Sequence, residues 1–517
     1  MTDILKVGLI LPGTEVQAWV AKTIEHLGEL NEIKLTGIIF LPTENKNGKI
    51  TDLHLKIDKR IFHPSPDAWK KTNIQELIKD IRVVEPESTI PFSRFDILIN
   101  LSNSKYPDGF LKFSKYGVWT PFDGNARLFN QSTFGWRELA NNLPVSTSAV
   151  EIVREEQPTV LSHEAALYVD DQSITRNQAF MLWKASANLA DAVKLLATIG
   201  ETEFFAKTKP VTIKAGLNTK LSAFQSIFLL IKQITYSFVK KIRRRFVFDQ
   251  WSVLLKPGQH ITPLTWDGFK HIIPPKDRIW ADPFLMEREG QTYLFIEEML
   301  FKTHRGTINY LKLDKEGNIL ENQVVLSRPY HLSYPFTFEH RGELYMIPET
   351  GGNQAIELYR CTRFPDQWEF QKTIMGDIRA VDTTLVEHAG RWWLFVTIAA
   401  ENNTTWDTLH LFYADDPLTD TWTPHPLNPV SLDVRNARMA GRIFRHDGGL
   451  VRPSQDSSHR YGYALNFNRI TTLTPTEYAE TRIDRLEPPA GTNIIAVHTF
   501  NYSQNWTALD MTVQRRK

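Results

Sequence analysis

The second half of the chain repeats one pattern of hydrophobic and polar positions, and each copy predicts two short β-strands. In 278–298 an Asp-Pro turn precedes an apolar strand, and a charged turn that contains a glycine leads into a second apolar strand. The pattern returns at 333–349 and 380–397, a weaker copy starts at 440, and a fifth starts at 494. Self-similar strand units at such a period are typical of β-propeller blades.

The repeats predict an all-β domain over 251–517 that forms a five-bladed propeller. Closure by a strand from the other end of the domain would seal the ring and remove the exposed sheet edges. A β-sandwich is the alternative, but it does not explain why the turn chemistry repeats. The predicted units are about 279–325, 330–375, 378–430, 435–485 and 490–511, the last completed by 251–255.

The first half shows a different pattern, in which apolar runs alternate with a segment of helical periodicity. The runs 6–11, 33–41 and 95–101 predict buried strands, and 16–30 predicts a helix. Strands that alternate with helices indicate a Rossmann-like α/β domain with a parallel, doubly wound sheet, here assigned to 1–205. No glycine fingerprint follows the first strand, so a dinucleotide is not expected.

A basic, amphipathic linker over 206–250 joins the two predicted domains. Its 207–220 part is lysine-rich and irregular, and 221–246 has apolar residues at helical spacing followed by a basic end. Lys232 and Gln233 interrupt the apolar run, which makes it a poor membrane-spanning segment. Two alternatives remain: contact with a membrane surface through 221–246, or packing of the apolar stripe on one of the domains.

Composition narrows the class of protein and its partners. The 517 residues are 42% hydrophobic and 23% charged, as expected of a globular protein of more than one domain. A net charge of +1 gives no reason to expect a nucleic-acid partner. Cys361 is the single cysteine, which excludes an intramolecular disulfide and fits a reducing compartment. The N-terminal pattern is not that of a signal peptide, so we expect a cytoplasmic location or a peripheral one at the inner face of a membrane.

Residues at equivalent places in the repeats are the candidates for chemistry. Alignment on the glutamates that follow each first strand puts three residues at one position: Asp282, Tyr334 and Asp382. Strand starts converge at a propeller's central channel, so Asp282, Asp382 and Glu349 form the predicted catalytic set. Such carboxylates suit acid/base work on a glycosidic bond. The alternatives are an Asp-Pro turn without function and, in place of Glu349, Glu297 or Glu298.

Four further residues are predicted to bind substrate. Arg442 and His498 would enter the same channel from the fourth and fifth units and hold an anionic group such as a phosphate or a uronate. Tyr334 belongs to the same channel, and Trp280 is a candidate platform for stacking a sugar, although core packing is the alternative for this tryptophan and for His498. No metal site is evident, although a channel lined by carboxylates suits Ca²⁺.

The first half resembles the formyltransferase family over 96–139 and a following strand-rich passage with a helix from about 175 to 196. In that family a strand similar to 116–119 leads into an Asn-x-His pair that orients the formyl carbonyl and moves protons. This chain has neither residue at the corresponding positions, Trp119/Thr120 and Pro121/Phe122. Asp170 or Asp171 could stand for the family's later acid, or belong to a solvated turn.

The missing histidine implies that this domain is degenerate, because formyl transfer needs a group that moves protons. Tetrahydrofolate is therefore not an expected cofactor, and N-formylation of a sugar is the least favoured activity. The resemblance leaves two roles open: binding of a small molecule or nucleotide sugar, or a structural unit that binds a partner.

The second half resembles the propeller domain of glucosamine inositolphosphorylceramide transferases and, more remotely, arabinanase, invertase and levansucrase propellers. The resemblance rests on RIWADPF, SYPFTF, IPET, VDTTL, MAGRIF and AVHTFNY, in that order. It implies a glycosyl-transferring enzyme of glycan or glycolipid biosynthesis, with a nucleotide sugar or a lipid-linked sugar as donor and no cofactor identified. The alternatives are a glycoside hydrolase, put in doubt by Tyr334 at an acid position, and a non-catalytic scaffold that binds glycans or a partner.

Overall fold

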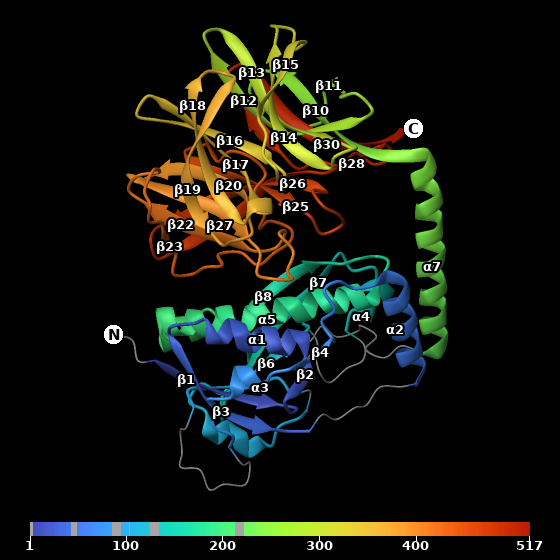
Figure 1. Cartoon of the computed structure of the whole chain (residues 1–517), viewed down its shortest axis with the longest axis vertical. Helices are drawn as coiled ribbons and strands as arrows, with labels where there is room; N and C mark the ends of the chain where they lie inside the picture. The colour runs from blue at the N-terminus through green and yellow to red at the C-terminus, as the bar shows by residue number, and fades with distance from the viewer. Residues whose placement is uncertain (1–3, 43–48, 85–94, 103, 125–133, 212–221) are drawn as a thin grey trace. The chain divides into compact units, whose positions relative to one another are not determined.

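The computed structural model describes residues 4–42, 49–84, 95–102, 104–124, 134–211 and 222–517 (Figure 1). The chain forms two compact units, Met1–Val239 and Lys240–Lys517. Most of the lysine-rich segment 207–220, and parts of the stretch 96–139, lie outside the described residues. Among the described residues, no helix is both long enough and apolar enough to cross a membrane.

The first unit contains a seven-stranded mixed sheet in the order β3-β1-β5-β6-β7-β8-β9. Its strands are β1 (Leu5–Leu11), β3 (Ile33–Phe40), β5 (Ile97–Asn100), β6 (Val118–Phe122), β7 (Val145–Val153), β8 (Val160–Tyr168) and β9 (Lys209–Pro210). A separate pair joins β2 (Glu15–Gln17) to β4 (Lys71–Asn73). The helical elements are α1 (Ala18–Gly28), α2 (Lys49–Phe62), α3 (Gln75–Ile78), η1 (Asp108–Phe113), α4 (Trp136–Ala140), α5 (Ile174–Ile199) and α6 (Glu201–Ala206).

The prediction of an all-parallel sheet holds for only part of this unit. Strands β3, β1, β5 and β6 pair in parallel, whereas β7, β8 and β9 add to the sheet antiparallel. Six residues separate β7 from β8, and so short a connection permits only an antiparallel neighbour. The sheet is therefore mixed rather than doubly wound, and the resemblance to formyltransferases stays a prediction.

Helix α5 confirms the helix expected at about 175–196 and packs on β7, β8 and α1. Its first turn is held by two acceptors: Ser173 Oγ accepts the main-chain N–H of Arg176, and the carboxylate of Asp58 on α2 accepts those of Ile174 and Thr175. These bonds satisfy N–H groups that have no partner within the helix.

The second unit consists of five antiparallel sheets and confirms the five-bladed propeller (Figure 1). Blade 1 contains β12 (Arg278–Arg288), β13 (Gln291–Leu300), β14 (Arg305–Leu313) and β15 (Ile319–Leu326). Blade 2 contains β16 (Ser333–His340), β17 (Glu343–Glu349), β18 (Ala355–Arg363) and β19 (Gln367–Gly376), with the short helix η2 (Gly351–Asn353). Blade 3 contains β20 (Ala380–His388), β21 (Arg391–Ile398), β22 (Leu409–Ala414) and β23 (Thr423–Pro424). Blade 4 contains β24 (Phe444–His446), β25 (Gly449–Asp456), β26 (Ala464–Leu473) and β27 (Tyr478–Leu486).

Blade 5 combines strands from both ends of the propeller. It contains β28 (Ile494–Ala496), β29 (Phe500–Tyr502), β30 (Trp506–Arg516), β10 (Val247–Pro257) and β11 (Lys270–Ile272). Strand β10 pairs with β30 along its whole length, from Val247 opposite Arg516 to Pro257 opposite Trp506. The strand 251–255 therefore closes the ring as the sequence predicts.

Helix α7 (Ala223–Phe246) precedes the propeller. It buries polar side chains and exposes most of its apolar ones, which is the reverse of ordinary core packing. Ser226, Leu229 and Gln233 are buried against the first unit, whereas the apolar stripe identified in the sequence is exposed. The stripe therefore does not pack on the unit that holds the first part of the helix.

Candidate functional site

The first strands of blades 1, 2 and 3 begin with the same backbone irregularity. Asp282, Tyr334 and Asp382 have φ of 52°, 45° and 54°, and each lies in a bulge of the pairing with the second strand. Residues other than glycine adopt positive φ uncommonly. The shared conformation therefore supports the alignment made from sequence and brings the three side chains toward one region at the propeller centre.

The second strands of the blades supply acidic residues to the same region. Glu297 lies opposite Ala281, and Glu349 lies opposite Ser333, so the two glutamates are equivalent. Glu298 points elsewhere and accepts hydrogen bonds from Arg278, Trp280 and Asn322. Of Glu297 and Glu298, the pairing therefore makes Glu297 the counterpart of Glu349 in blade 1.

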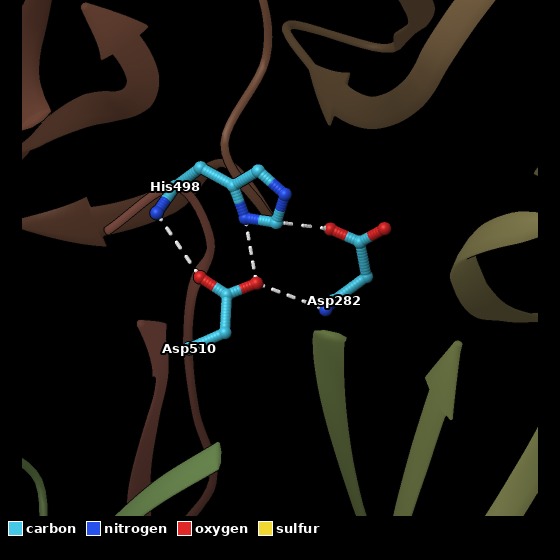
Figure 2. Close-up of side chains that lie close together, drawn as sticks. All are labelled: Asp282, His498 and Asp510. Carbon is cyan, nitrogen blue, oxygen red and sulfur yellow. Dashed lines mark hydrogen bonds and ion pairs between the residues drawn. The ribbon is translucent and has the colours of Figure 1, made fainter. Parts of the chain in front are cut away.

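Three buried side chains from blades 1 and 5 form one cluster, which we call the aspartate–histidine cluster: Asp282, His498 and Asp510 (Figure 2). His498 Nδ1 lies 2.6 Å from Asp510 Oδ2 and 3.9 Å from Asp282 Oδ1. Burial alone would lower the pKa of His498, but the charges of Asp510 and Asp282 outweigh it and raise the pKa to about 9. Burial raises the pKa of Asp282 to about 7, against the lowering effect of the His498 charge, and the charges of neighbouring carboxylates add to the rise.

Hydrogen bonds already occupy the acceptor positions of this cluster. Asp510 Oδ1 accepts the main-chain N–H groups of His498 and Thr499, and Oδ2 accepts that of Asp282 together with the imidazole. A carboxylate has about four lone-pair positions, so little capacity remains for a cation. The three groups lie close enough to ligate a metal, but their bonding favours a role in fixing His498 and the start of β12.

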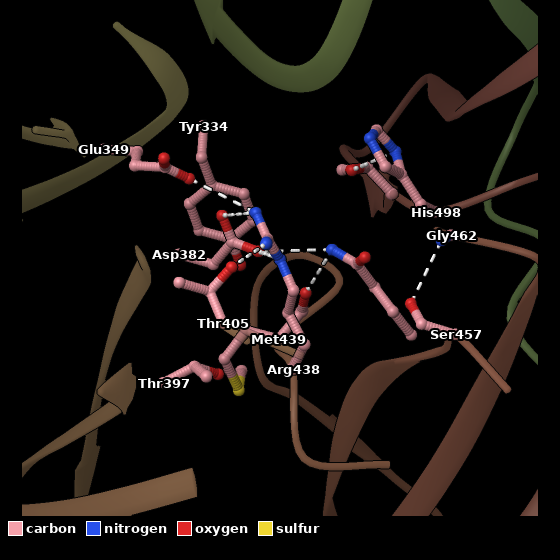
Figure 3. A network of polar contacts seen from close by, with 12 residues as sticks. Tyr334, Glu349, Asp382, Thr397, Thr405, Arg438, Met439, Ser457, Gly462 and His498 are labelled. Carbon is pink, nitrogen blue, oxygen red and sulfur yellow. Dashed lines mark hydrogen bonds and ion pairs between the residues drawn. The ribbon is translucent and has the colours of Figure 1, made fainter. Parts of the chain in front are cut away.

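A second cluster, the arginine cluster, is built around Arg438 between blades 2, 3 and 4 (Figure 3). Arg438 Nε donates to Asp382 Oδ2 at 2.6 Å, and Nη2 donates to Asp382 Oδ1 and to Glu349 Oε2, both at 3.3 Å. Nη1 donates to Thr405 Oγ1, and the amide of Gln455 donates to Asp382. One guanidinium therefore holds two carboxyl groups next to each other.

Glu349 is the more accessible member of this pair, and its pKa is raised. Burial, followed by the charge of Asp382, raises the pKa of Glu349 to about 8, and Arg438 opposes that rise. The Glu349 side chain is 15% exposed, whereas that of Asp382 is 2% exposed. Glu349 is thus protonated at neutral pH and more accessible than its partner, which suits a general acid.

The structure brings together four of the predicted residues, Asp282, Asp382, Glu349 and His498, and places Tyr334 between them. The hydroxyl of Tyr334 bonds Thr384 Oγ1 at 2.8 Å and accepts the N–H of Gly441 at 2.9 Å, and its main-chain N–H donates to Asp282. The ring is completely buried, so Tyr334 links blades rather than presenting a surface for ligand.

Arg442 and Trp280 lie outside both clusters. Arg442 donates to the carbonyl and hydroxyl of Thr337 and lies over Phe336, and burial lowers its pKa to about 10. Trp280 donates to Glu298 at 2.8 Å and packs in the core between blades 1 and 5. Trp280 therefore packs in the core, as the alternative to a sugar-stacking platform predicts.

Sequence reasoning missed four residues of the site: Arg438, Asp510, Tyr461 and Trp251. Trp251 stacks on the His498 imidazole with ring centres 3.9 Å apart, and Tyr461 lies over Arg438 at 5.0 Å and edge-on to His498 at 5.3 Å. Asp510 is detectable in the sequence, because it lies on the second strand of the fifth copy as Glu349 lies on that of the second. Arg438 carries no such signal, since it precedes the weakest copy.

The fold and its centre define a class: a five-bladed β-propeller in which carboxyl groups converge with one arginine and one histidine. Residues 273–493 match the family described as glucosamine inositolphosphorylceramide transferase 1, N-terminal. The chain is 36% identical over 210 residues to glucosamine inositolphosphorylceramide transferase 1 of Arabidopsis thaliana, covering 39% of this chain and 27% of that protein. It is 34% identical over 208 residues to the protein of that name from Oryza sativa subsp. japonica, covering 40% of this chain and 28% of the relative.

The chain thus spans less than a third of the length of these relatives. Among solved structures, Zg3597, a family 117 glycoside hydrolase from Zobellia galactanivorans, aligns over 52% of this chain and 90% of its own. That alignment has 13% sequence identity and a TM-score of 0.34, which is too low to support a functional comparison.

Proposed function

We propose that the protein is a carbohydrate-active enzyme that transfers a glycosyl group at the centre of the propeller, in the synthesis of a glycan or glycolipid. The observation that carries the proposal is the pairing of a protonated, partly accessible Glu349 with Asp382 on one guanidinium. The similarity to a region of proteins named glucosamine inositolphosphorylceramide transferase 1 supports the substrate class.

In this mechanism Glu349 supplies the proton that glycosyl transfer needs. As the bond between the anomeric carbon and the leaving oxygen breaks, the leaving oxygen takes the proton of Glu349. The acceptor hydroxyl then bonds the anomeric carbon and releases its proton to the Glu349 carboxylate, which restores the acid. The Asp382 carboxylate stabilises the positive charge that develops on the sugar ring, and Asp282 adds to this effect as it ionises through its pKa of about 7. The donor would be a nucleotide sugar or a lipid-linked sugar, and water as acceptor would give hydrolysis.

A non-catalytic glycan-binding scaffold is the second candidate, and one observation favours it. Asp282 accepts hydrogen bonds from Thr499 and Tyr334, and Asp382 accepts them from Arg438 and Gln455. The two aspartates are only 5% and 2% exposed. Aspartates satisfied in this way stabilise the ring whether or not any reaction takes place.

Turnover of a panel of nucleotide sugars, glycolipids and oligosaccharides distinguishes the two candidates. We expect wild-type turnover to fall above about pH 8, the pKa of Glu349, and to fall by about 100-fold or more in Glu349→Gln, the range for loss of a general acid. Glu343→Gln is the matched control, because Glu343 is exposed at the other end of the same strand, β17. Ligand binding without turnover, unchanged in Glu349→Gln, would reject the catalytic role and leave the scaffold.

A further inference from the structure

Helix α7 attaches to the first unit through a narrow, largely polar face. His54 bonds Ser226 at 3.0 Å and Gln233 at 3.1 Å, and Leu229 packs beside Trp136. These α7 residues recur at spacings of three and four, so they lie on one side of the helix. The first unit therefore binds α7 mainly by hydrogen bonds to two polar side chains.

The opposite side of α7 is apolar and exposed. Positions two apart on a helix are about 200° apart around its axis, so Phe228 and Ile231 point away from Ser226 and Leu229. The exposed fractions are 78% for Phe224, 54% for Ile227, 63% for Phe228, 58% for Ile231, 44% for Ile234 and 64% for Phe238. Single exposed apolar residues are common on proteins, but a continuous stripe of them marks an interaction surface.

The charge on α7 indicates what that surface contacts. The helix has six basic residues and no acidic one, and five of the six lie in its last seven residues: Lys240, Lys241, Arg243, Arg244 and Arg245. A second copy packed in parallel would bring the basic ends together, and one packed antiparallel would offer neither basic end an acidic partner on the helix. An anionic lipid surface, by contrast, accepts both the apolar side chains and the cations.

We infer that α7 lies in the surface layer of an anionic membrane, with the Phe224–Phe238 stripe inserted among the lipids and the basic end on the headgroups. In this geometry apolar faces enter the interface by about 5–10 Å without spanning the bilayer. The polar face bound to the first unit stays on the protein side. The inference is independent of the proposed glycosyl transfer, because it rests on this helix alone.

Co-sedimentation of the full chain with vesicles tests the inference. The vesicles contain either phosphatidylcholine alone or phosphatidylcholine mixed with the anionic lipid phosphatidylglycerol, whose negative surface attracts basic segments. We expect binding to the anionic vesicles that weakens with added salt. Phe228→Ser/Ile231→Ser should lower the partition coefficient about tenfold or more. Arg244→Gln/Arg245→Gln should lower it about 25-fold, at about fivefold for each charge.

The matched control is Phe370→Ser/Ile483→Ser, which removes two apolar side chains that are 52% and 40% exposed on outer strands of the propeller. This variant should bind as the wild type does. Wild-type binding to both kinds of vesicle alike, or unchanged binding by the stripe variant, would overturn the inference. A wild-type dimer in light scattering that ignores vesicles and becomes a monomer in the stripe variant would instead assign the stripe to a second copy.

Discussion

Arg438 is the residue on which the candidate site most depends, because it pairs with Asp382 and also donates a hydrogen bond to Glu349. Removal of one member of a buried ion pair leaves an uncompensated charge and typically costs about 3–5 kcal/mol. We therefore expect Asp382→Asn and Arg438→Met each to lower the free energy of unfolding of the propeller by about 3 kcal/mol.

A double-mutant cycle in urea measures this coupling. Asp382→Asn with Arg438→Met should lose clearly less stability than the sum of the two single changes, because the first change already removes the partner of the second. Additive losses would show that the two side chains do not interact as the 2.6 Å contact implies.

Three titrating groups at the centre predict that the propeller loses stability as pH rises. His498 has a folded pKa of about 9 against its usual 6.5, so its contribution is complete below about pH 6.5 and is lost as pH rises through 9. Asp282 and Glu349 hold protons in the folded state up to about pH 7 and 8, whereas the unfolded chain releases them near 4, so their ionisation also disfavours the folded state.

We therefore expect the melting temperature of the propeller to be lower at pH 9 than at pH 6, with a contribution of about 3 kcal/mol from His498. His498→Gln should flatten the dependence between pH 6.5 and 9, whereas His459→Gln, at an exposed position, should leave it unchanged. A melting temperature that rises over this range in the wild type would contradict the assignment.

At the scale of single residues, the sequence predicts the acids better than their partners. Asp282 and Asp382 occupy equivalent positions in the repeat and Glu349 ends the second strand of its unit, so the repeat predicts that the three converge. Trp280 illustrates the limit: it lies two residues from Asp282, but only the pairing of β12 with β13 shows that it faces Glu298 and the core. Arg438 comes from the loop before β24, where no repeated pattern guides its placement.

At the scale of elements, blade 4 meets blade 5 at a close approach that only glycine permits. Gly441 has φ of +128°, and a Cβ there would lie 2.0 Å from the carbonyl oxygen of Phe500. We expect Gly441→Ala to destabilise the propeller by about 3 kcal/mol or more, since neither backbone segment can move away freely.

Gly342→Ala is the control for this prediction. Gly342 also has a positive φ, +80°, but a Cβ there would meet nothing within 4 Å. The control should lose only about 1 kcal/mol, the cost of the left-handed conformation for alanine. Equal losses in thermal melts of the two variants would mean that the contact with Phe500 is not limiting.

Most strands and helices are predictable from the sequence, because strand and helix periodicity are local properties of the chain. The propeller units agree with the observed blades, and α5 extends the predicted helix by only a few residues. The antiparallel half of the first sheet was not predicted, since pairing direction depends on how the segments between β6, β7 and β8 run in space. The exposure of the α7 stripe also cannot be predicted from the sequence, because a helical pattern does not show which face of the helix packs against the protein.

At the scale of the whole molecule, the propeller depends on the pairing of β10 with β30. Deletion of 506–517 would remove the central strand of blade 5 and leave β10, β28 and β29 with unpaired edges. Asp510 would also be lost, and with it the acceptor that holds His498 and the start of β12.

We expect the truncated chain to be expressed largely as aggregate and to lack the cooperative melt of the wild type. Deletion of Lys517 alone, which follows β30, is the control and should be neutral. A soluble truncated chain that melts cooperatively at the wild-type temperature would contradict the role of β30 in closing the ring.

The pairing of β10 with β30 also makes a circular permutation of the propeller feasible. Val247 and Arg516 lie opposite each other, so the order of blades along the gene is only one of several that describe the same ring. A circular permutant that joins 516 to 247 through a short glycine-serine linker, with new ends between the exposed Lys315 and Glu316, keeps all five sheets intact. Such a permutant would carry the propeller without α7 or the first unit, and would allow its chemistry and its attachment to lipid to be studied as separate properties.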